Sequence, residues 1–207
     1  LADAIGATGR PLLRVHTAGS VGGSTAIAAA HHIMSGRYRR VLTVAFEKQS
    51  ESNAMWALSP RIPFQPQLTA GAGGYFAPLI RAYIRRSNAP DECGMQVAIK
   101  DRLHGLKNPY AHLKMKGIDL AMVRDSPMLW DPIRYLETCP SSDGACAMVL
   151  TCEEVAAPTA AWVHGLSTRS EPVTLAGRDQ VTPQAGRDCG RDVYTQARVT
   201  PREIDVA

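Results

Sequence analysis

The sequence predicts an α/β fold, and three observations support this prediction. Residues 11–16 form a short apolar run of β character, and a glycine-rich turn separates them from a small-residue helix at 22–34. Gly36 follows as the expected C-terminal stop of that helix. A second apolar run at 40–46 completes a β-turn-α-β unit.

The run at 40–46 is too apolar to face water on both sides, so we expect a central strand. The helix at 22–34 is rich in alanine and glycine, whose small side chains permit close packing, so we expect it to be buried between sheets. Ser20 lies at or just before the helix N-terminus, where free backbone N–H groups and the helix dipole stabilise negative charge. Position alone leaves two interpretations of Ser20 open: an N-cap serine and a residue of a reactive site.

The rest of the chain alternates turn-rich segments with helices and strands. We expect the chain to open inside a helix and to continue, after the first unit, with a loop at 58–74, helices at 75–86 and 90–103, and an irregular segment at 108–119. Strands at 145–151 and 160–166, a loop at 177–190, a helix at 192–197 and the start of a strand at 203–207 follow.

Two details of the middle segment bear on function. Gly71 to Gly74 could cradle a phosphate through exposed amides, but the run lacks the Lys-Ser/Thr of a P-loop, so a flexible loop is the preferred interpretation. Pro78 is expected in the first turn of its helix, where proline is tolerated.

Composition and charge limit the class of protein. With 207 residues and 45% hydrophobic composition, the chain can bury a sizeable core. The formal net charge is +4, with acidic and basic residues interspersed. Arg81, Arg85 and Arg86 fit one helix face and could attract a polyanion, although a solvated face is the better interpretation. No base-reading motif is present, so we expect no nucleic-acid partner.

The five cysteines are odd in number and include no Cys-x-x-Cys pair. This argues against a disulfide framework and a zinc site, so we expect no metal and a cytoplasmic location. No apolar run approaches the roughly 20 residues that a membrane-spanning helix requires, so we expect no membrane span.

Three segments, in order and at compatible spacing, resemble the thiolase superfamily. HTAGSVGGSTA at 16–26 resembles its nucleophile turn, and Ser20 stands where the family has its acyl-accepting cysteine. VAFEKQS at 44–50 resembles the family's Gly-Gly-x-Glu-Ser-Met-Ser segment, and CPSSDGACA at 139–147 resembles its Ser-Asp-Gly-Ala-Ala element. Asp143 in the last element is interpreted as a turn former rather than a general base.

Further segments point to one branch of this superfamily. Residues 107–112 and 130–133 look like the sterol-carrier-type branch, the lipid-transfer-protein thiolases and their relatives. Within that branch, HTAGSVGGSTA, FEKQSESNAMWAL, GAGGYFAP and AGRDQVTPQAGRD look most like actinobacterial aldolases that act on steroid side chains.

The resemblance implies a thiolase-like layered α-β-α-β-α fold, in which two similar halves form a chain nearly twice this long. We therefore expect the present chain to be incomplete. Residues 1–156 would form the N-terminal half, with a loop or cap excursion at about 54–135 that covers the substrate. Residues 157–207 would begin the C-terminal half.

The serine at the nucleophile position puts ordinary thiolase chemistry in doubt, because a hydroxyl is a weak nucleophile without an activating base. Retro-aldol cleavage of a β-hydroxyacyl thioester requires only a base, an oxyanion site and a proton donor. We expect Ser20 to act by hydrogen bonding and helix capping, and His16 not to form a dyad with it. The expected substrate-binding residues are His16, Gly19, Gly22, Gly23, Gly73 and Gly74. The acid and base residues are expected beyond Ala207.

Three function classes remain open. The first is a lyase that cleaves a β-hydroxyacyl-CoA steroid side chain to a ketone and a short acyl-CoA. The alternatives are an acetyl-CoA acyltransferase of lipid metabolism and a noncatalytic acyl-CoA or lipid-binding protein. Coenzyme A would enter as part of the substrate, with no covalently bound cofactor. The resemblance also implies a homodimer and a complex with an OB-fold partner protein.

Overall fold

A computed structural model describes residues 2–53, 71–154, 159–172, 177–179 and 181–206. The chain forms two compact units, each made of two stretches. Unit 1 consists of Leu1–Phe46 and Ala145–Leu166, and unit 2 consists of Glu47–Gly144 and Ser167–Ala207. The predicted boundary after residue 156 and the beginning of the predicted excursion, residues 54–70, lie outside the described residues, so the predicted domain division stays a prediction.

Most of the two-stranded ladder of β1 (Arg40–Lys48) and β4 (Asp143–Thr151) belongs to unit 1. The hydroxyl of Thr43 donates to the carbonyl of Met148 at 3.3 Å, and the N–H of Cys152 donates to the carbonyl of Arg39 at 3.2 Å. Residue numbers rise along one strand as they fall along the other, so the strands are antiparallel. The strands predicted at 40–46 and 145–151 are confirmed.

The strand β1 was expected to be central, but among the described residues it pairs with β4 only. Its apolar side chains are accordingly accessible, with Leu42 54% and Phe46 61% exposed. The apolar side chains of β1 therefore lie on a strand face that no other element of the described chain covers.

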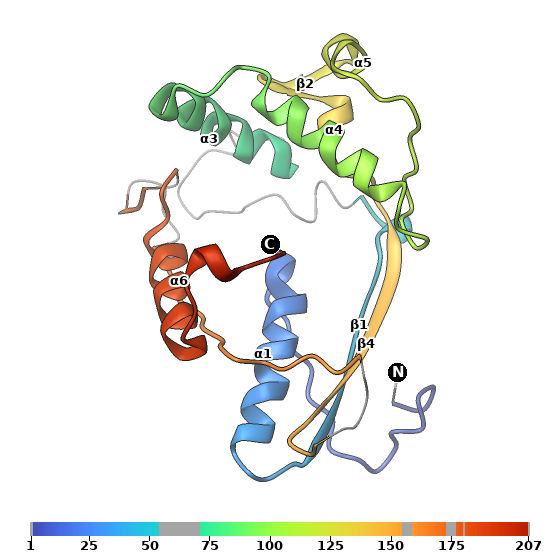
Figure 1. Ribbon diagram of the computed structural model, residues 1–207. Helices are drawn as coiled ribbons and strands as arrows, with labels where there is room; N and C mark the ends of the chain where they lie inside the picture. The colour runs from blue at the N-terminus through green and yellow to red at the C-terminus, as the bar shows by residue number, and fades with distance from the viewer. Residues whose placement is uncertain (1, 54–70, 155–158, 173–176, 180, 207) are drawn as a thin grey trace. The chain divides into compact units, whose positions relative to one another are not determined.

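The helix α1 (Val21–Met34) follows the short 3-10 turn η1 (Ala18–Ser20) and runs beside the two strands (Figure 1). Gly36 adopts a φ of +73° and donates its N–H to Ile33 at 2.9 Å, which confirms the predicted stop. Ala29 and Ala30 are buried, whereas both ends of the helix are exposed. The predicted burial of this helix between two sheets is not found, because the described residues of unit 1 take part in a single two-stranded ladder.

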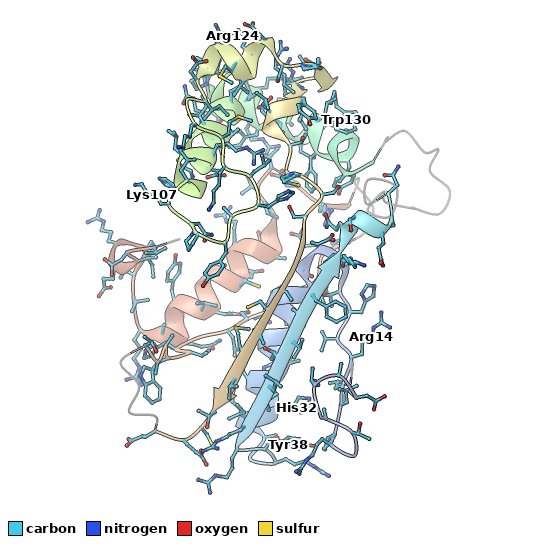
Figure 2. All side chains as sticks on the ribbon, turned by 90° about the vertical axis from the view of Figure 1, so that its right-hand side faces the viewer. Arg14, His32, Tyr38, Lys107, Arg124 and Trp130 are labelled. Carbon is cyan, nitrogen blue, oxygen red and sulfur yellow. The ribbon has the colours of Figure 1, made fainter. Side chains whose placement is uncertain are left out.

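The turn from α1 to β1 is stabilised by an aromatic contact. The rings of His32 and Tyr38 meet edge to face, with centroids 5.7 Å apart, and lie close together in Figure 2. This favours a packing role for His32.

The strands predicted at 11–16 and 160–166 are wrong: the described chain forms no strand there. Apolar composition predicts a strand only where a neighbouring strand satisfies its backbone groups, and neither run has one in the described structure. Leu13 and Trp162 are 66% and 68% exposed. The predicted opening helix is a series of turns, and the chain end forms the 3-10 turn η5 (Pro201–Glu203) instead of beginning a strand.

Unit 2 contains α3 (Gly71–Ser87), α4 (Cys93–Gly105) and α5 (Leu120–Asp125) (Figure 1). An antiparallel hairpin of β2 (Met128–Trp130) and β3 (Ile133–Arg134) packs with them. Two short 3-10 turns, η2 (Gln49–Glu51) and η3 (Tyr135–Glu137), and the helix α6 (Gln184–Ala197) complete the unit. Its small apolar core consists of Ala77, Ile118, Val123 and Ile133.

Two helices of unit 2, α3 and α6, begin earlier than predicted, whereas α4 begins at Cys93, three residues after the predicted start. Gly71 to Gly74 form the first turn of α3, not a flexible loop, and Pro78 lies inside that helix. Similarly, α6 begins at Gln184, inside the segment predicted as a loop. Glycine has a poor helix propensity, so these segments resembled loops, but tertiary packing overrides propensity. At α6 the carboxylate of Glu171 accepts the N–H of Ala185 at 2.8 Å.

Two of the three arginines of α3, Arg81 and Arg86, are engaged with acidic side chains. Arg81 donates to Asp131 through Nε at 2.9 Å and Nη2 at 2.5 Å, and Arg86 pairs with Asp179 at 2.6 Å. These pairs support the interpretation of this face as a solvated surface, not a polyanion site. None of the described helices has both the length and the apolar composition needed to cross a membrane.

Candidate active site

The turn between residues 16 and 24 places Ser20 at the beginning of α1, as predicted. Ala18 adopts a positive φ of 50°, which is uncommon for a residue other than glycine and turns the chain sharply before the helix. Ser20 is the residue before the first helical position, with φ of −91° and ψ of 5°. It is exposed, as are His16, Gly19, Gly22 and Gly23.

The Ser20 hydroxyl does not cap the helix. It donates toward the carbonyl oxygen of Thr17 at 3.0 Å and the hydroxyl of Thr17 at 3.1 Å, and no cap hydrogen bond forms. Thr17 in turn donates to the hydroxyl of Ser24 at 2.8 Å. The predicted capping role is therefore wrong, because the hydroxyl is engaged upstream of the helix.

This chain of three hydroxyls contains no titratable group. Activation of a serine requires a base within about 2.6–3.2 Å of its hydroxyl. In the described structure His16 makes no hydrogen bond to Ser20, as the sequence analysis expected. Within the described residues the turn can therefore donate and accept hydrogen bonds, and no base is hydrogen-bonded to Ser20.

The backbone beside Ser20 is suited to an anion. Gly22 and Gly23 occupy the first turn of α1, whose N–H groups have no intrahelical acceptor. A Cβ atom built on Gly19, Gly22 or Gly23 would meet nothing within 4 Å. Packing within the described chain therefore does not require these glycines, and the space on their Cβ side is open. A developing oxyanion in this space would also interact favourably with the helix dipole.

The predicted site residues fall into two groups. His16, Gly19, Ser20, Gly22 and Gly23 belong to the turn in unit 1. Gly73 and Gly74 belong to the first turn of α3 in unit 2, and Gly73 lies directly against the ring of Trp130. Close packing accounts for Gly73 without a ligand, and substrate binding by these residues stays a prediction.

A second polar cluster, which the sequence patterns do not predict, lies in unit 2. Asp143 begins β4, and its carboxylate accepts the Ser50 N–H at 2.9 Å and the Ser50 hydroxyl at 2.6 Å. The neighbouring Ser142 contacts Nδ1 of His112 at 2.7 Å. Asp143 is therefore a hydrogen-bond acceptor joining two distant segments, not a turn former. One signal in the sequence could have indicated this contact: Ser50 and Asp143 each lie in a segment that resembles a thiolase motif.

The environment of Asp143 lowers the pKa of its carboxyl group. The hydrogen bond from the Ser50 hydroxyl is the largest cause, followed by the Ser50 N–H, and the charge of His112 contributes less. A carboxylate with a lowered pKa is a weak general base at neutral pH. Its ionised form stabilises the folded state above the unfolded pKa, and this contribution is lost as the pH falls through the lowered folded pKa.

The Ser50→Ala substitution is therefore expected to raise the pKa of Asp143 toward its ordinary value, because the main donor is removed. Carboxyl titration followed by NMR measures this shift. Asp179, whose pKa is lowered chiefly by Arg86, is the internal control and should titrate unchanged. An Asp143 titration identical in both proteins would contradict the assignment.

Comparisons with known proteins identify the group that this chain resembles. No protein-family model matches it. An acetyl-CoA acetyltransferase of Methanothermobacter thermautotrophicus is 26% identical, over 100% of this chain and 55% of its own length. Sterol carrier protein 2 of Rattus norvegicus is 23% identical, over 98% of the chain and 41% of its own length.

A lyase resembles a shorter part of the chain. The 17-hydroxy-3-oxo-4-pregnene-20-carboxyl-CoA lyase of Mycobacterium tuberculosis is 28% identical, over 63% of this chain and 36% of its own length. The chain thus spans about half or less of the length of the curated relatives that it matches.

The fold has a counterpart among solved structures. The structure described as the Ltp2-ChsH2(DUF35) aldolase matches with a TM-score of 0.76 and 22% sequence identity, over 98% of this chain and 56% of the other. The chain therefore has a thiolase-like α/β fold and is similar in sequence to the thiolase-like lipid-transfer branch.

Proposed function

We propose that this protein is a thiolase-like retro-aldolase that cleaves a β-hydroxyacyl-CoA, with a steroid side chain as the substrate class. The observation that carries the proposal is the turn at Ser20, which keeps open amides at a helix N-terminus but presents an unactivated hydroxyl. Such a site can stabilise an enolate without accepting an acyl group.

The chemistry is balanced without a covalent intermediate. A base removes the proton of the β-hydroxyl, the bond between Cα and Cβ breaks, and a ketone leaves. The electron pair moves into the thioester, whose enolate oxygen is held by the N–H groups of Gly22 and Gly23. Protonation at Cα then gives the shorter acyl-CoA. Coenzyme A takes part only as a portion of substrate and product.

Names of similar proteins support this substrate class. Besides the mycobacterial lyase, a steroid side-chain-cleaving aldolase of Thermomonospora curvata is 28% identical over 64% of this chain. The similar solved structure is described as an aldolase of two components, Ltp2 and ChsH2(DUF35). By analogy, the proposal includes a complex with an OB-fold partner protein and a homodimer of this chain.

An acyltransferase is the second candidate, because the archaeal acetyl-CoA acetyltransferase is similar along the whole chain. The two reactions differ in their use of free coenzyme A. Thiolysis of a β-ketoacyl-CoA consumes one thiol per turnover, whereas retro-aldol cleavage consumes none.

Thiol counting tests the proposal. The full protein with its partner is incubated separately with a β-hydroxyacyl-CoA carrying a bulky tertiary alcohol and with a β-ketoacyl-CoA plus free coenzyme A. We expect ketone and shorter acyl-CoA from the first substrate, with free thiol constant. Thiol loss with the β-keto substrate and no reaction of the β-hydroxy substrate would assign the protein to the transferases.

A further inference from the structure

The second polar cluster contains a serine whose hydroxyl meets an imidazole, a contact found at one place among the described residues. The hydroxyl oxygen of Ser142 lies 2.7 Å from Nδ1 of His112, within the distance at which a base can take the hydroxyl proton. The hydroxyls of Ser50 and Ser167 instead contact carboxylates, at 2.6 Å and 2.8 Å. A carboxylate is a weak base at neutral pH, whereas imidazole is the side chain that most often serves as a general base. The Ser142–His112 contact therefore has the geometry of a nucleophile and its base.

Local hydrogen bonds shape the segment that carries His112, between α4 and α5. The side-chain oxygen of Asn108 accepts the N–H of Tyr110 at 2.9 Å, and its carbonyl oxygen accepts the N–H of Ala111 at 3.2 Å. Asparagine commonly forms such a turn by bonding to the backbone two residues further on. The turn ends directly before His112 and fixes the backbone from which the imidazole extends.

The serine is held in place by the residue that follows it. Asp143 is the first residue of β4, and its carboxylate accepts the N–H of Ser50 at 2.9 Å and the Ser50 hydroxyl at 2.6 Å. The charges of Asp143 and His112 also interact. A negative charge near the ring favours the imidazolium that forms when imidazole takes a proton, which is one function of the acid in a serine triad. Asp143 can therefore support proton transfer from Ser142 to His112.

The surroundings of this contact are open. His112 and Asp143 are exposed, and Ser142 is half-buried. The next residue is Gly144, where a Cβ atom would meet nothing within 4 Å, so space remains beside the start of β4. A bulky ligand needs a cavity that covers most of its surface, whereas a small acyl donor needs only access to the nucleophile. The contact therefore suits a small substrate.

We propose that Ser142 and His112 form a second reactive site, at which the Ser142 hydroxyl accepts an acyl group from a small, activated carboxylic ester. His112 carries its hydrogen on Nε2, so Nδ1 takes the hydroxyl proton. The bond from the Ser142 oxygen to the acyl carbon forms as the bond from that carbon to the alkoxy oxygen breaks. The leaving group keeps the electron pair and receives the proton from His112. The proposal is independent of the retro-aldol reaction, because it concerns only residues of unit 2.

Acetylation of the full chain by 4-nitrophenyl acetate tests the site. Peptide mass spectrometry locates the acetyl groups, and their build-up with time gives a rate for each residue. Ser87 is the matched internal control, because it is an exposed serine of unit 2 whose hydroxyl donates to a backbone carbonyl, that of Tyr83, at 2.7 Å. We expect acetylation of Ser142 to be faster than that of Ser87 by about a hundredfold, a usual gain from general base catalysis.

His112→Gln should slow the acetylation of Ser142 by about a hundredfold, because an amide can keep a hydrogen bond but cannot take the proton. His104→Gln, which replaces another exposed histidine of unit 2, should leave the rate unchanged. Equal acetylation of Ser142 and Ser87 in the wild-type protein would overturn the proposal, and so would an unchanged rate in His112→Gln. If His112→Gln does not fold, the comparison of the two serines in the wild-type protein decides alone.

Discussion

Gly73→Ala is expected to destabilise unit 2 by about 1–3 kcal/mol, the usual cost of inserting a methyl group into a close contact. A Cβ at this position would overlap carbon atoms of the Trp130 ring. The ring cannot easily move aside, because Trp130 pairs with Ile133 in the hairpin and the next residue, Asp131, binds Arg81 of α3. Urea unfolding of wild type and variant measures the effect.

Gly22→Ala is the matched control, because it makes the same change near the N-terminus of a helix where a Cβ meets nothing within 4 Å. It should stabilise the protein by up to about 1 kcal/mol through helix propensity. In a Trp130→Ala background, Gly73→Ala should lose most of its cost, since the overlapping ring is gone. Equal effects of the two glycine substitutions in the wild-type background would refute the close packing.

The sequence predicted those elements whose local signals agree. In α1, small residues, a glycine stop and a following apolar run all indicate the same boundaries, and the structure has them within one residue. The strand predicted at 11–16 shows the limit of this approach. Its composition is right, but pairing depends on residues far away in the chain, which local patterns do not report. At Gly73 the local signal was misleading, because glycine disfavours a helix. The contact with the Trp130 ring, far away in the chain, explains the glycine inside α3.

The same distinction holds for the candidate site. The position of Ser20 at a helix N-terminus follows from neighbouring residues and could be predicted. The direction of its hydroxyl depends on the positive φ of Ala18 and on Thr17, and a propensity argument wrongly assigned it to capping. The bonds between Ser50 and Asp143 join positions 93 apart, and no spacing rule predicts them.

Ser20→Ala is expected to distinguish a hydrogen-bonding role from a nucleophilic one, because the losses of turnover expected for the two roles differ by several orders of magnitude. Loss of a serine nucleophile lowers turnover by about a millionfold in a well-studied hydrolase. Here the hydroxyl donates only to Thr17, and no base contacts it in the described structure. We therefore expect turnover of a β-hydroxyacyl-CoA to fall by no more than about tenfold, the range of one hydrogen bond.

Stability of Ser20→Ala should also change by less than the 0.5–2 kcal/mol that removal of a true N-cap costs, because no cap bond exists to be lost. Ser24→Ala, which removes another hydroxyl from the same chain of three, is the control and should behave similarly in both assays. Intact-mass spectrometry during turnover completes the experiment. An acyl ester that appears on wild-type protein and is absent from Ser20→Ala would establish covalent catalysis and exclude the role proposed for this residue.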